Sequence, residues 1–314
     1  MSNYEKRTLL SVKGLKQHFK TGRQVVKAVN GISFEINNGE TYGLVGESGS
    51  GKSTTGRSVI RLYDPSEGEI IFDGVKISGK LNKAKRQHLR TKMQMIFQDP
   101  MASLNPRKKI YDSIEMGLIV HNICATAAQR RDRVYSILNK VGLSEEYADR
   151  YPHELSGGQR QRVGIARALV MDPLLIIADE AISALDVSIQ AQVVNLMKDI
   201  QKETGTAYLF IAHDLSMVRN ISDKIGVLHM GYLVESGTSD DIFNNPIHPY
   251  TKSLLSAIPV VNPRIEKERE NLEYDYETNN INYEKGTKQK ISETHYVLAT
   301  NEEFKEWTNI VTVL

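Results

Sequence analysis

The chain has 314 residues, with 40 Lys and Arg against 38 Asp and Glu, so its net charge is only +2. Hydrophobic residues make up 40% and charged residues 25%, as in ordinary globular proteins, which excludes wholesale disorder and low-complexity scaffolds. The single cysteine, Cys124, excludes an internal disulfide and any zinc or iron–sulfur site built from the cysteines of one chain. With no secretory signal visible and no apolar run near the ~20 residues that span a bilayer, we expect a soluble protein of a reducing compartment.

The first part of the chain is predicted to be rich in strands. Short alternating strands are expected at residues 9–12 and 32–36, followed by a turn at 37–39. A short apolar strand at 41–45 then runs into a glycine-rich loop, and the helix after that loop extends to about residue 63. Two more strands are predicted at the end of this part, over residues 69–72 and 93–97.

The glycine-rich loop fits the pattern G-x-x-x-x-G-K-[ST] in full, between a strand and a helix. Its glycines let backbone N–H groups turn inward around a β-phosphate, and the following helix N-terminus adds partial positive charge. Lys52 can reach the β- and γ-phosphates, and the Ser53 hydroxyl can ligate Mg²⁺. A chance match in an ordinary turn occurs about once in a hundred chains of this length. We therefore predict that nucleotide phosphates are bound by Gly46, Glu47, Ser48, Gly49, Ser50, Gly51, Lys52, Ser53 and Thr54.

Helical periodicity covers residues 110–148 and 157–171, and further strands are predicted at 174–178, 208–212 and 225–228. A helix beginning near Asp214 separates the last two strands. Apolar strands that alternate with helices favour a parallel sheet covered on both faces.

Polar side chains follow several of these strands, and they form a second candidate group. Asp179 at the end of the 174–178 strand can hold Mg²⁺, and Glu180 can polarise a water for attack on a γ-phosphate. His213 can donate to the γ-phosphate, and Gln98 offers an amide to Mg²⁺ or water. Taken alone, each of these residues is more often a solvated strand end or a helix cap. Together with the phosphate loop, they are more often part of a nucleotide site. Because carboxyl ends of parallel strands share one edge, we expect these side chains to converge on one crevice.

The net charge and the composition of the chain change near residue 262. Residues 262–314 carry a net charge of −4, which leaves +6 on residues 1–261, too weak an excess to indicate a nucleic-acid surface. The 265–290 segment is polar and is predicted to be a linker or loosely ordered tail. A small docked element is predicted at the end from Tyr296, Val297, Phe304 and Trp307.

The loop Ser156, Gly157, Gly158 and Gln159, at a predicted helix N-terminus, is a second potential anion site. Together with the phosphate loop, Asp179 and Glu180, in this order, it resembles the signature of ABC-type ATPases over residues 8–240. In this resemblance Gln98 is the Q-loop residue, His213 the switch histidine, and residues 183–186, ending in Asp186, the D-loop. Phe19 occupies the place of an aromatic ring against adenine, although a strand-edge hydrophobe explains it nearly as well.

The resemblance implies an α/β fold of the P-loop NTPase class, with a RecA-like core, an antiparallel β-subdomain and a helical ABC subdomain over about 105–170. It implies a cassette over 1–245 and an extension with an acidic tail over 246–314. It also implies a head-to-tail dimer holding two ATP molecules with Mg²⁺, each touching the phosphate loop of one subunit and Ser156–Gln159 of the other.

A narrower resemblance, to the oligopeptide and dipeptide importer branch, rests on residues 97–107, 181–192 and 245–251. Residues 105–107 fit the F-type ATPase of such importers better than the D-type. Its implied partners are a D-type ATPase, two transmembrane permease subunits and, indirectly, an extracellular peptide-binding protein, with no nucleic acid. The implied location is the cytoplasmic face of the membrane.

Two features qualify this narrower resemblance. Ala181 replaces a proline usual after the catalytic glutamate, which removes a backbone restraint but no chemical group. The iron–sulfur cluster of some members is not expected, because Cys124 is the only cysteine. The alternatives left open are an importer of dipeptides, nickel or another small solute, and a non-transport ABC ATPase acting on ribosomes or DNA.

Overall fold

The computed structural model of the protein describes residues 7–22, 24–183, 185–258, 272, 274, 276 and 281–309. Ala184 of the predicted D-loop lies outside the described residues, as do residues 265–271, 273, 275 and 277–280 of the predicted linker. The linker prediction is wrong at its end, because Thr287–Lys290 pair with a neighbouring strand.

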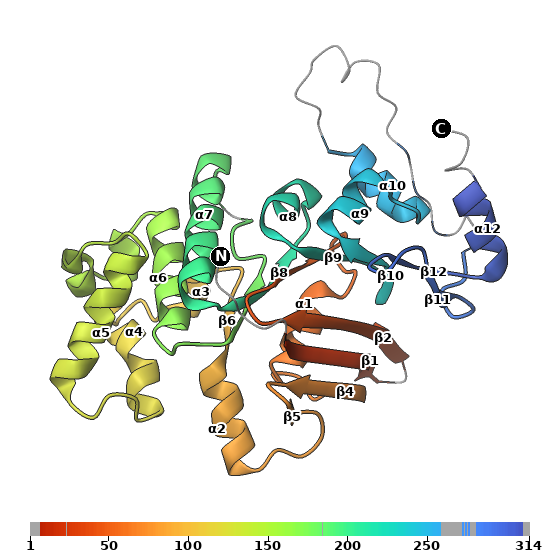
Figure 1. Cartoon of the computed structure of the whole chain (residues 1–314). Helices are drawn as coiled ribbons and strands as arrows, with labels where there is room; N and C mark the ends of the chain where they lie inside the picture. The colour runs from red at the N-terminus through yellow and green to blue at the C-terminus, as the bar shows by residue number, and fades with distance from the viewer. Residues whose placement is uncertain are drawn as a thin grey trace.

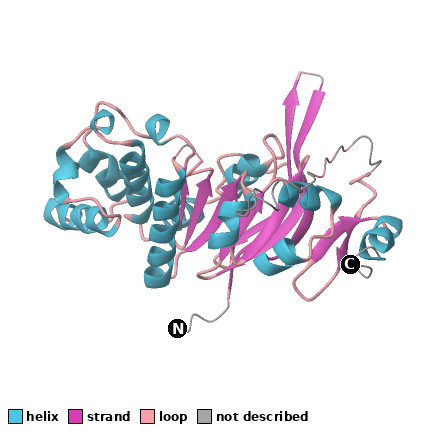
Figure 2. Ribbon diagram, turned by 90° about the horizontal axis from the view of Figure 1, so that it is seen from above, coloured by secondary structure: helices cyan, strands magenta, loops and turns pink. Residues whose placement is uncertain are grey.

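An antiparallel sheet is built from the first strands, in the order β2-β1-β4-β5 (Figure 1). Its members are β1 (Thr8–Thr21), β2 (Gln24–Asn37), β4 (Glu67–Phe72) and β5 (Val75–Lys76). The prediction of short strands at 9–12 and 32–36 is wrong in length, because β1 and β2 each have 14 residues. Register shifts, one of them between Val12 and Leu15, let the hairpin continue where the apolar alternation breaks. The hairpin projects from the molecule in Figure 2.

A larger mixed sheet crosses the molecule in the order β11-β12-β10-β9-β3-β8-β7-β6. Strands β9, β3, β8, β7 and β6 run parallel to one another, while antiparallel pairs join β9 to β10, β10 to β12 and β12 to β11. The parallel strands are β3 (Thr41–Val45), β6 (Met93–Ile96), β7 (Leu175–Asp179), β8 (Ala207–Ala212) and β9 (Lys224–His229).

The register of the parallel strands brings their carboxyl ends level. Val45 pairs with Ala212, Asp179 with Ile211, and Ile96 with Ala178. The loops after β3, β6, β7 and β8 therefore leave the sheet along one edge, as predicted from the sequence.

Two hydrophobic cores lie on opposite faces of this sheet. Leu44 and Ile177 belong to the core shared with the antiparallel sheet, while Val45 and Ala178 belong to the core shared with the helices. Successive side chains of a strand point to opposite faces, so a strand buried on both sides is apolar throughout. This explains the unbroken apolar runs in the sequence.

The helices cover both faces of the large sheet and form an arm at one end of it (Figures 1 and 2). The arm contains α3, α4, α5 and α6, inserted between β6 and β7. The helices and 3-10 turns up to β9 are α1 (Lys52–Val59), α2 (Lys83–Lys92), α3 (Pro100–Ser103), α4 (Ile110–Val120), α5 (Ala127–Lys140), η1 (Glu145–Asp149), η2 (Pro152–Glu154), α6 (Gly157–Leu169), α7 (Val187–Thr204) and α8 (Leu215–Ile221).

Helix α1 ends at Val59, earlier than the predicted end near residue 63. Arg61 has a φ of 64°, in the left-handed region, so the helical path cannot continue through it. The periodic stretch 110–148 is helical as predicted, but it is divided by a turn in which Asn122 and Cys124 also have positive φ.

The C-terminal part extends the large sheet. Its elements are β10 (Tyr232–Thr238), α9 (Ser239–Asn244), α10 (Pro249–Ser256), β11 (Thr287–Lys290), β12 (Tyr296–Ala299) and α12 (Asn301–Asn309). Strand β12 pairs with β10, and Trp307 of α12 is buried, which confirms the docked element predicted from Tyr296 and Trp307. Within the described residues, no helix combines the length and the apolar character needed to cross a membrane.

Candidate active site

The phosphate loop lies between β3 and α1, and its backbone path requires glycine. Gly46 has a φ of 151° and Gly51 a φ of 104°. A Cβ at Gly46 would lie 2.0 Å from the Leu228 carbonyl oxygen, and one at Gly51 would lie 2.2 Å from that of Ala28. Both positions therefore exclude any side chain. Gly51 caps α1 without a side-chain acceptor, so the first N–H groups of the helix keep their capacity to bind an anion.

Lys52 is the cationic group of this loop. Its side chain is buried, and its ammonium donates to the carbonyl oxygens of Gly46 and Glu47, both at 2.7 Å. Burial lowers the pKa of Lys52, while the negative charges of Glu180, Asp179 and Glu47 act in the opposite direction. Both carboxylates predicted from the sequence therefore act on the charge of this lysine.

Asp179 ends β7 with its side chain only 1% exposed. Its Oδ2 lies 3.5 Å from Arg57 Nη2, and its Oδ1 has no hydrogen-bond partner among the described residues. A buried carboxylate oxygen without a partner is costly unless something else binds it. The site therefore fits Mg²⁺, for which carboxylate and hydroxyl oxygens are suitable ligands.

Glu180 follows β7 and is held in a strained conformation with a φ of 46°. Its carbonyl oxygen accepts hydrogen bonds from Ser183 N–H at 3.2 Å and Ser183 Oγ at 2.9 Å, which stabilise this turn. Its carboxylate Oε2 accepts a hydrogen bond from Gln98 Nε2 at 2.7 Å. The structure therefore brings together these two side chains, which are 82 positions apart in the sequence.

His213 and Phe19 are the remaining residues predicted to contact the nucleotide. His213 is exposed and directly follows β8, whose last residue pairs with Val45 before the phosphate loop. Phe19 is half-buried in β1, opposite Val26, and its ring meets that of Tyr63 edge-on at 5.3 Å. Contact of His213 with a γ-phosphate, and of Phe19 with adenine, stay predictions.

Ser156, Gly157, Gly158 and Gln159 begin α6 in the helical arm, which stands apart from α1 in Figure 1. Ser156 Oγ accepts from Gln159 N–H at 3.3 Å, while Gln159 Oε1 accepts from Ser156 N–H at 2.9 Å, a capping box. Asp186 is exposed before α7. The roles of Ser156–Gln159 and Asp186 across a dimer stay predictions.

Sequence reasoning missed two residues that contact this site. Arg57 lies on α1 one turn after Ser53, and its spacing on the helix was the available signal. Tyr250 Oη accepts a hydrogen bond from the N–H of Glu47 at 2.9 Å. That contact joins residues 203 positions apart, so no local pattern could reveal it.

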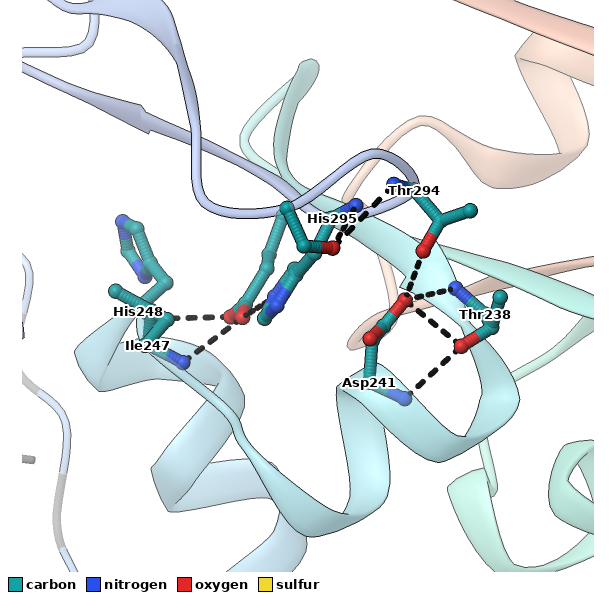
Figure 3. Close-up of polar contacts among 8 residues, drawn as sticks. Thr238, Asp241, Ile247, His248, Thr294 and His295 are labelled. Atoms are coloured by element: carbon teal, nitrogen blue, oxygen red, sulfur yellow. Dashed lines mark hydrogen bonds and ion pairs between the residues drawn. The ribbon is translucent and has the colours of Figure 1, made fainter.

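A network of polar side chains, of which Glu235, His248 and His295 are buried, attaches the C-terminal elements to β10, as Figure 3 shows. The Glu235 carboxylate accepts hydrogen bonds from the N–H groups of Ile247 at 2.8 Å and His248 at 2.9 Å, and His295 Nε2 lies 2.7 Å from it. Asp241 accepts from Thr238 and from Thr294 Oγ at 2.7 Å. These bonds fix α9, α10 and the β11–β12 hairpin relative to one another.

Two histidines in this region make stability depend on pH. Burial lowers the pKa of His248 to about 3 and that of His229 to about 4. In the unfolded chain both titrate near pH 6.5, so between pH 6.5 and about 4 only the unfolded state takes up protons. Stability is therefore full above pH 6.5 and is lost as the pH falls below it, by about 1.4 kcal/mol per pH unit for each histidine.

The variant His248→Asn tests this dependence. Asparagine keeps the helix-capping acceptor that His248 Nδ1 provides for Tyr250 N–H, but it does not titrate. We expect the loss of unfolding free energy between pH 7.5 and 5.5, measured by urea denaturation, to shrink by about 1 kcal/mol. His153→Asn, at an exposed position, should lose as much unfolding free energy between pH 7.5 and 5.5 as the unmodified chain. The same full loss in His248→Asn would contradict the role of His248 in the pH dependence.

Two family models match the chain. The ABC transporter model matches residues 29–183, and that of the oligopeptide/dipeptide transporter C-terminal region matches residues 234–286. With the similarity to relatives described next, the chain belongs to the ABC transporter family of ATP-binding proteins, whose members couple ATP hydrolysis to transport.

The chain is similar to curated proteins over nearly its whole length. It is 56% identical over 301 residues to the oligopeptide transport ATP-binding protein OppF of Bacillus subtilis (strain 168), covering 96% of this chain and 99% of that protein. It is 52% identical to OppF of Streptococcus mutans, covering 96% and 98%. It is 49% identical to the dipeptide transport ATP-binding protein DppF of Lactococcus lactis subsp. cremoris, covering 95% and 96%.

Solved structures confirm the predicted fold class, an α/β P-loop NTPase with an antiparallel β-subdomain and a helical subdomain. The dimeric post-hydrolysis state of the ATP-binding cassette MJ0796, bound to ADP and Pi, has a TM-score of 0.67 and 30% identity, covering 73% of this chain and 98% of that one. The cbiO1 protein of Clostridium perfringens, part of the cbiONQ transporter complex, has a TM-score of 0.69 and 28% identity, covering 84% and 99%.

Proposed function

We propose that this chain binds and hydrolyses ATP to energise the uptake of oligopeptides, as a peripheral subunit at the cytoplasmic face of the cell membrane. The observation that carries the proposal is the combination of two regions. Asp179 and Glu180, at the end of β7, act electrostatically on Lys52 of the phosphate loop, and residues 234–286 match the C-terminal region of peptide transporters. The first region supports ATP chemistry, and the second supports the peptide cargo.

In this proposal the loop 46–54 holds the phosphates through backbone N–H groups, and Lys52 neutralises the β- and γ-phosphates. Ser53, Asp179 and Gln98 would hold Mg²⁺, which supplies further neutralisation of phosphate charge when it is bound. Glu180 orients a water and takes its proton, while Gln98 fixes the Glu180 carboxylate. His213 donates to the γ-phosphate, and Phe19 packs against adenine.

The working unit is a dimer, with Ser156–Gln159 and Asp186 of one subunit facing the nucleotide of the other. Support comes from the exposed Ser156, which caps α6 in the helical arm, and from the dimeric state of the similar cassette MJ0796. The second subunit is a related D-type ATPase. Helix N-termini favour anions, so Ser156 and the first N–H groups of α6 suit a γ-phosphate.

The permease subunits dock on the surface around Asp99–Arg107 and the helical arm. A groove of about 900 Å³ lies beside this surface, lined by α2, β6 and the turns after α1 and β5, with Phe97, next to Gln98, in its wall. Its charged lining is mainly basic, consisting of Arg61, Lys80, Arg86, Arg90 and Arg167 with Asp64. A permease segment in this groove would act on Gln98 and thus on Glu180. Cargo is delivered by an extracellular peptide-binding protein, which does not contact this chain.

A dipeptide importer is the second candidate, favoured by the 49% identity to DppF of Lactococcus lactis. The ATPase site does not contact the cargo, so residues 46–54 and 179–180 serve either function equally. Uptake assays therefore decide between the two.

We expect deletion of the gene for this chain to abolish uptake of labelled tetra- and pentapeptides, and the intact chain to restore it. Dipeptide uptake and nickel uptake should persist in the deletion strain. Purification of the chain from detergent-solubilised membranes should recover a second ATPase and two permeases. Loss of dipeptide uptake alone would favour the second candidate, and recovery of ribosomes or DNA without permeases would overturn transport.

A further inference from the structure

The C-terminal extension contacts the phosphate loop through a hydrogen bond of Tyr250. The peptide unit between Gly46 and Glu47 is bound on both sides, because its carbonyl oxygen accepts from Lys52 Nζ at 2.7 Å and its N–H donates to Tyr250 Oη at 2.9 Å. A peptide unit bound at both ends cannot rotate without breaking a hydrogen bond. The Tyr250 hydroxyl therefore fixes the orientation of the peptide plane whose carbonyl oxygen accepts the hydrogen bond from Lys52 Nζ.

Tyr250 is itself firmly placed. Its side chain is 1% exposed and its N–H donates to His248 Nδ1 at 3.1 Å. Its ring lies 4.1 Å from the His229 ring and 5.3 Å from that of Tyr274, centre to centre. Pro249 begins α10, where a fixed φ suits the first helical turn. The hydroxyl has little freedom to leave the Glu47 N–H.

The position of α10 depends in turn on Glu235. The segment before α10 is attached through the N–H groups of Ile247 and His248 to the Glu235 carboxylate, which is fully buried in β10 (Figure 3). Strand β10 continues from the turn at Gly231, whose N–H donates to the Ser50 carbonyl oxygen at 2.9 Å. The loop is thus contacted at two points, by the Gly231 backbone before β10 and by the Tyr250 side chain of the extension.

We propose that Tyr250 is a positioning residue for ATP, whose hydroxyl keeps the Gly46–Glu47 peptide unit in the orientation that phosphate binding needs. The inference rests on the proposed role of residues 46–54 in holding phosphates, and it is independent of the transported solute. It gives the C-terminal extension a direct part in nucleotide binding. The loop binds the phosphates before hydrolysis begins. Loss of the Tyr250 hydroxyl should therefore change the affinity for ATP rather than the turnover at saturating ATP.

The test is the variant Tyr250→Phe in the full chain, which keeps the ring and removes the hydroxyl. A neutral hydrogen bond of this kind corresponds to about a two- to tenfold change in affinity. We expect the Kd for ATP, measured by titration calorimetry, and the KM to rise by that factor, with kcat within twofold of the unmodified chain. Tyr274→Phe is the matched control, because it removes a hydroxyl that bonds Tyr283 in the same cluster.

An unchanged Kd in Tyr250→Phe would overturn the inference. An equal loss of affinity in Tyr274→Phe would overturn it too, since general loosening of the cluster would then explain the effect. Lys52→Ala separates this inference from the function on which it rests. If Lys52→Ala binds ATP normally, the role of the loop fails; if it loses binding while Tyr250→Phe does not, only the positioning role fails.

Discussion

Glu180→Gln is expected to bind ATP as tightly as the unmodified chain and to lose turnover by at least about a hundredfold, the usual contribution of a general base. Glutamine has the same shape, and its side-chain oxygen can still accept the hydrogen bond from Gln98 Nε2. The turn at φ 46° is fixed by the bonds from Ser183 to the Glu180 carbonyl, which the substitution leaves in place. The substitution removes only the ability of the Glu180 carboxylate to take a proton from water.

Phosphate release from ATP measures this loss, and a fluorescent ATP analogue measures the affinity. Glu203→Gln serves as the control, because Glu203 is an exposed carboxylate at the end of α7, paired with Lys140 at 2.8 Å. It should hydrolyse ATP at the normal rate. Turnover of Glu180→Gln within tenfold of normal would remove Glu180 as the base and leave Gln98 or His213 to orient the water.

The parts of the site that are continuous in sequence were predictable. The phosphate loop needs glycine where a Cβ would strike Leu228 or Ala28, and that requirement is visible as a spacing of residue types. The meeting of Gln98 with Glu180 was predictable for a different reason. Both follow parallel strands, and parallel strands end at one edge, so the topology brings them together without any detail of side-chain packing.

Other features depend on contacts that the sequence pattern does not record. Helix α2 carries a single buried apolar residue, Leu89, so its periodicity is too weak to predict it. The β1–β2 hairpin extends past its apolar core residues because cross-strand pairing, not burial, continues the strands. The contact of Tyr250 with Glu47 requires β9, β10 and α10 to be placed first, and tertiary placement of that kind is absent from local spacing.

Lys52→Ala is expected to weaken ATP binding by about ten- to a hundredfold, the range for hydrogen bonds to charged groups. The ammonium is buried, so its attraction to phosphate is weakly screened by water. Titration calorimetry of the full chain measures the change, and a thermal melt without nucleotide checks the fold. Lys202→Ala, at an exposed position on α7, is the control and should bind normally. An affinity within twofold of normal in Lys52→Ala would contradict the predicted phosphate contact.

The affinity that remains in Lys52→Ala measures what the backbone N–H groups of the loop provide by themselves. Lys52 and Tyr250 hold opposite ends of the Gly46–Glu47 peptide unit, so their effects on ATP affinity should not add. In Lys52→Ala, Tyr250→Phe should cost less than in the unmodified chain, because the carbonyl no longer has an ammonium to orient. Additive losses would mean that the two side chains act on the nucleotide independently, and the shared peptide unit would then not be the route by which Tyr250 acts.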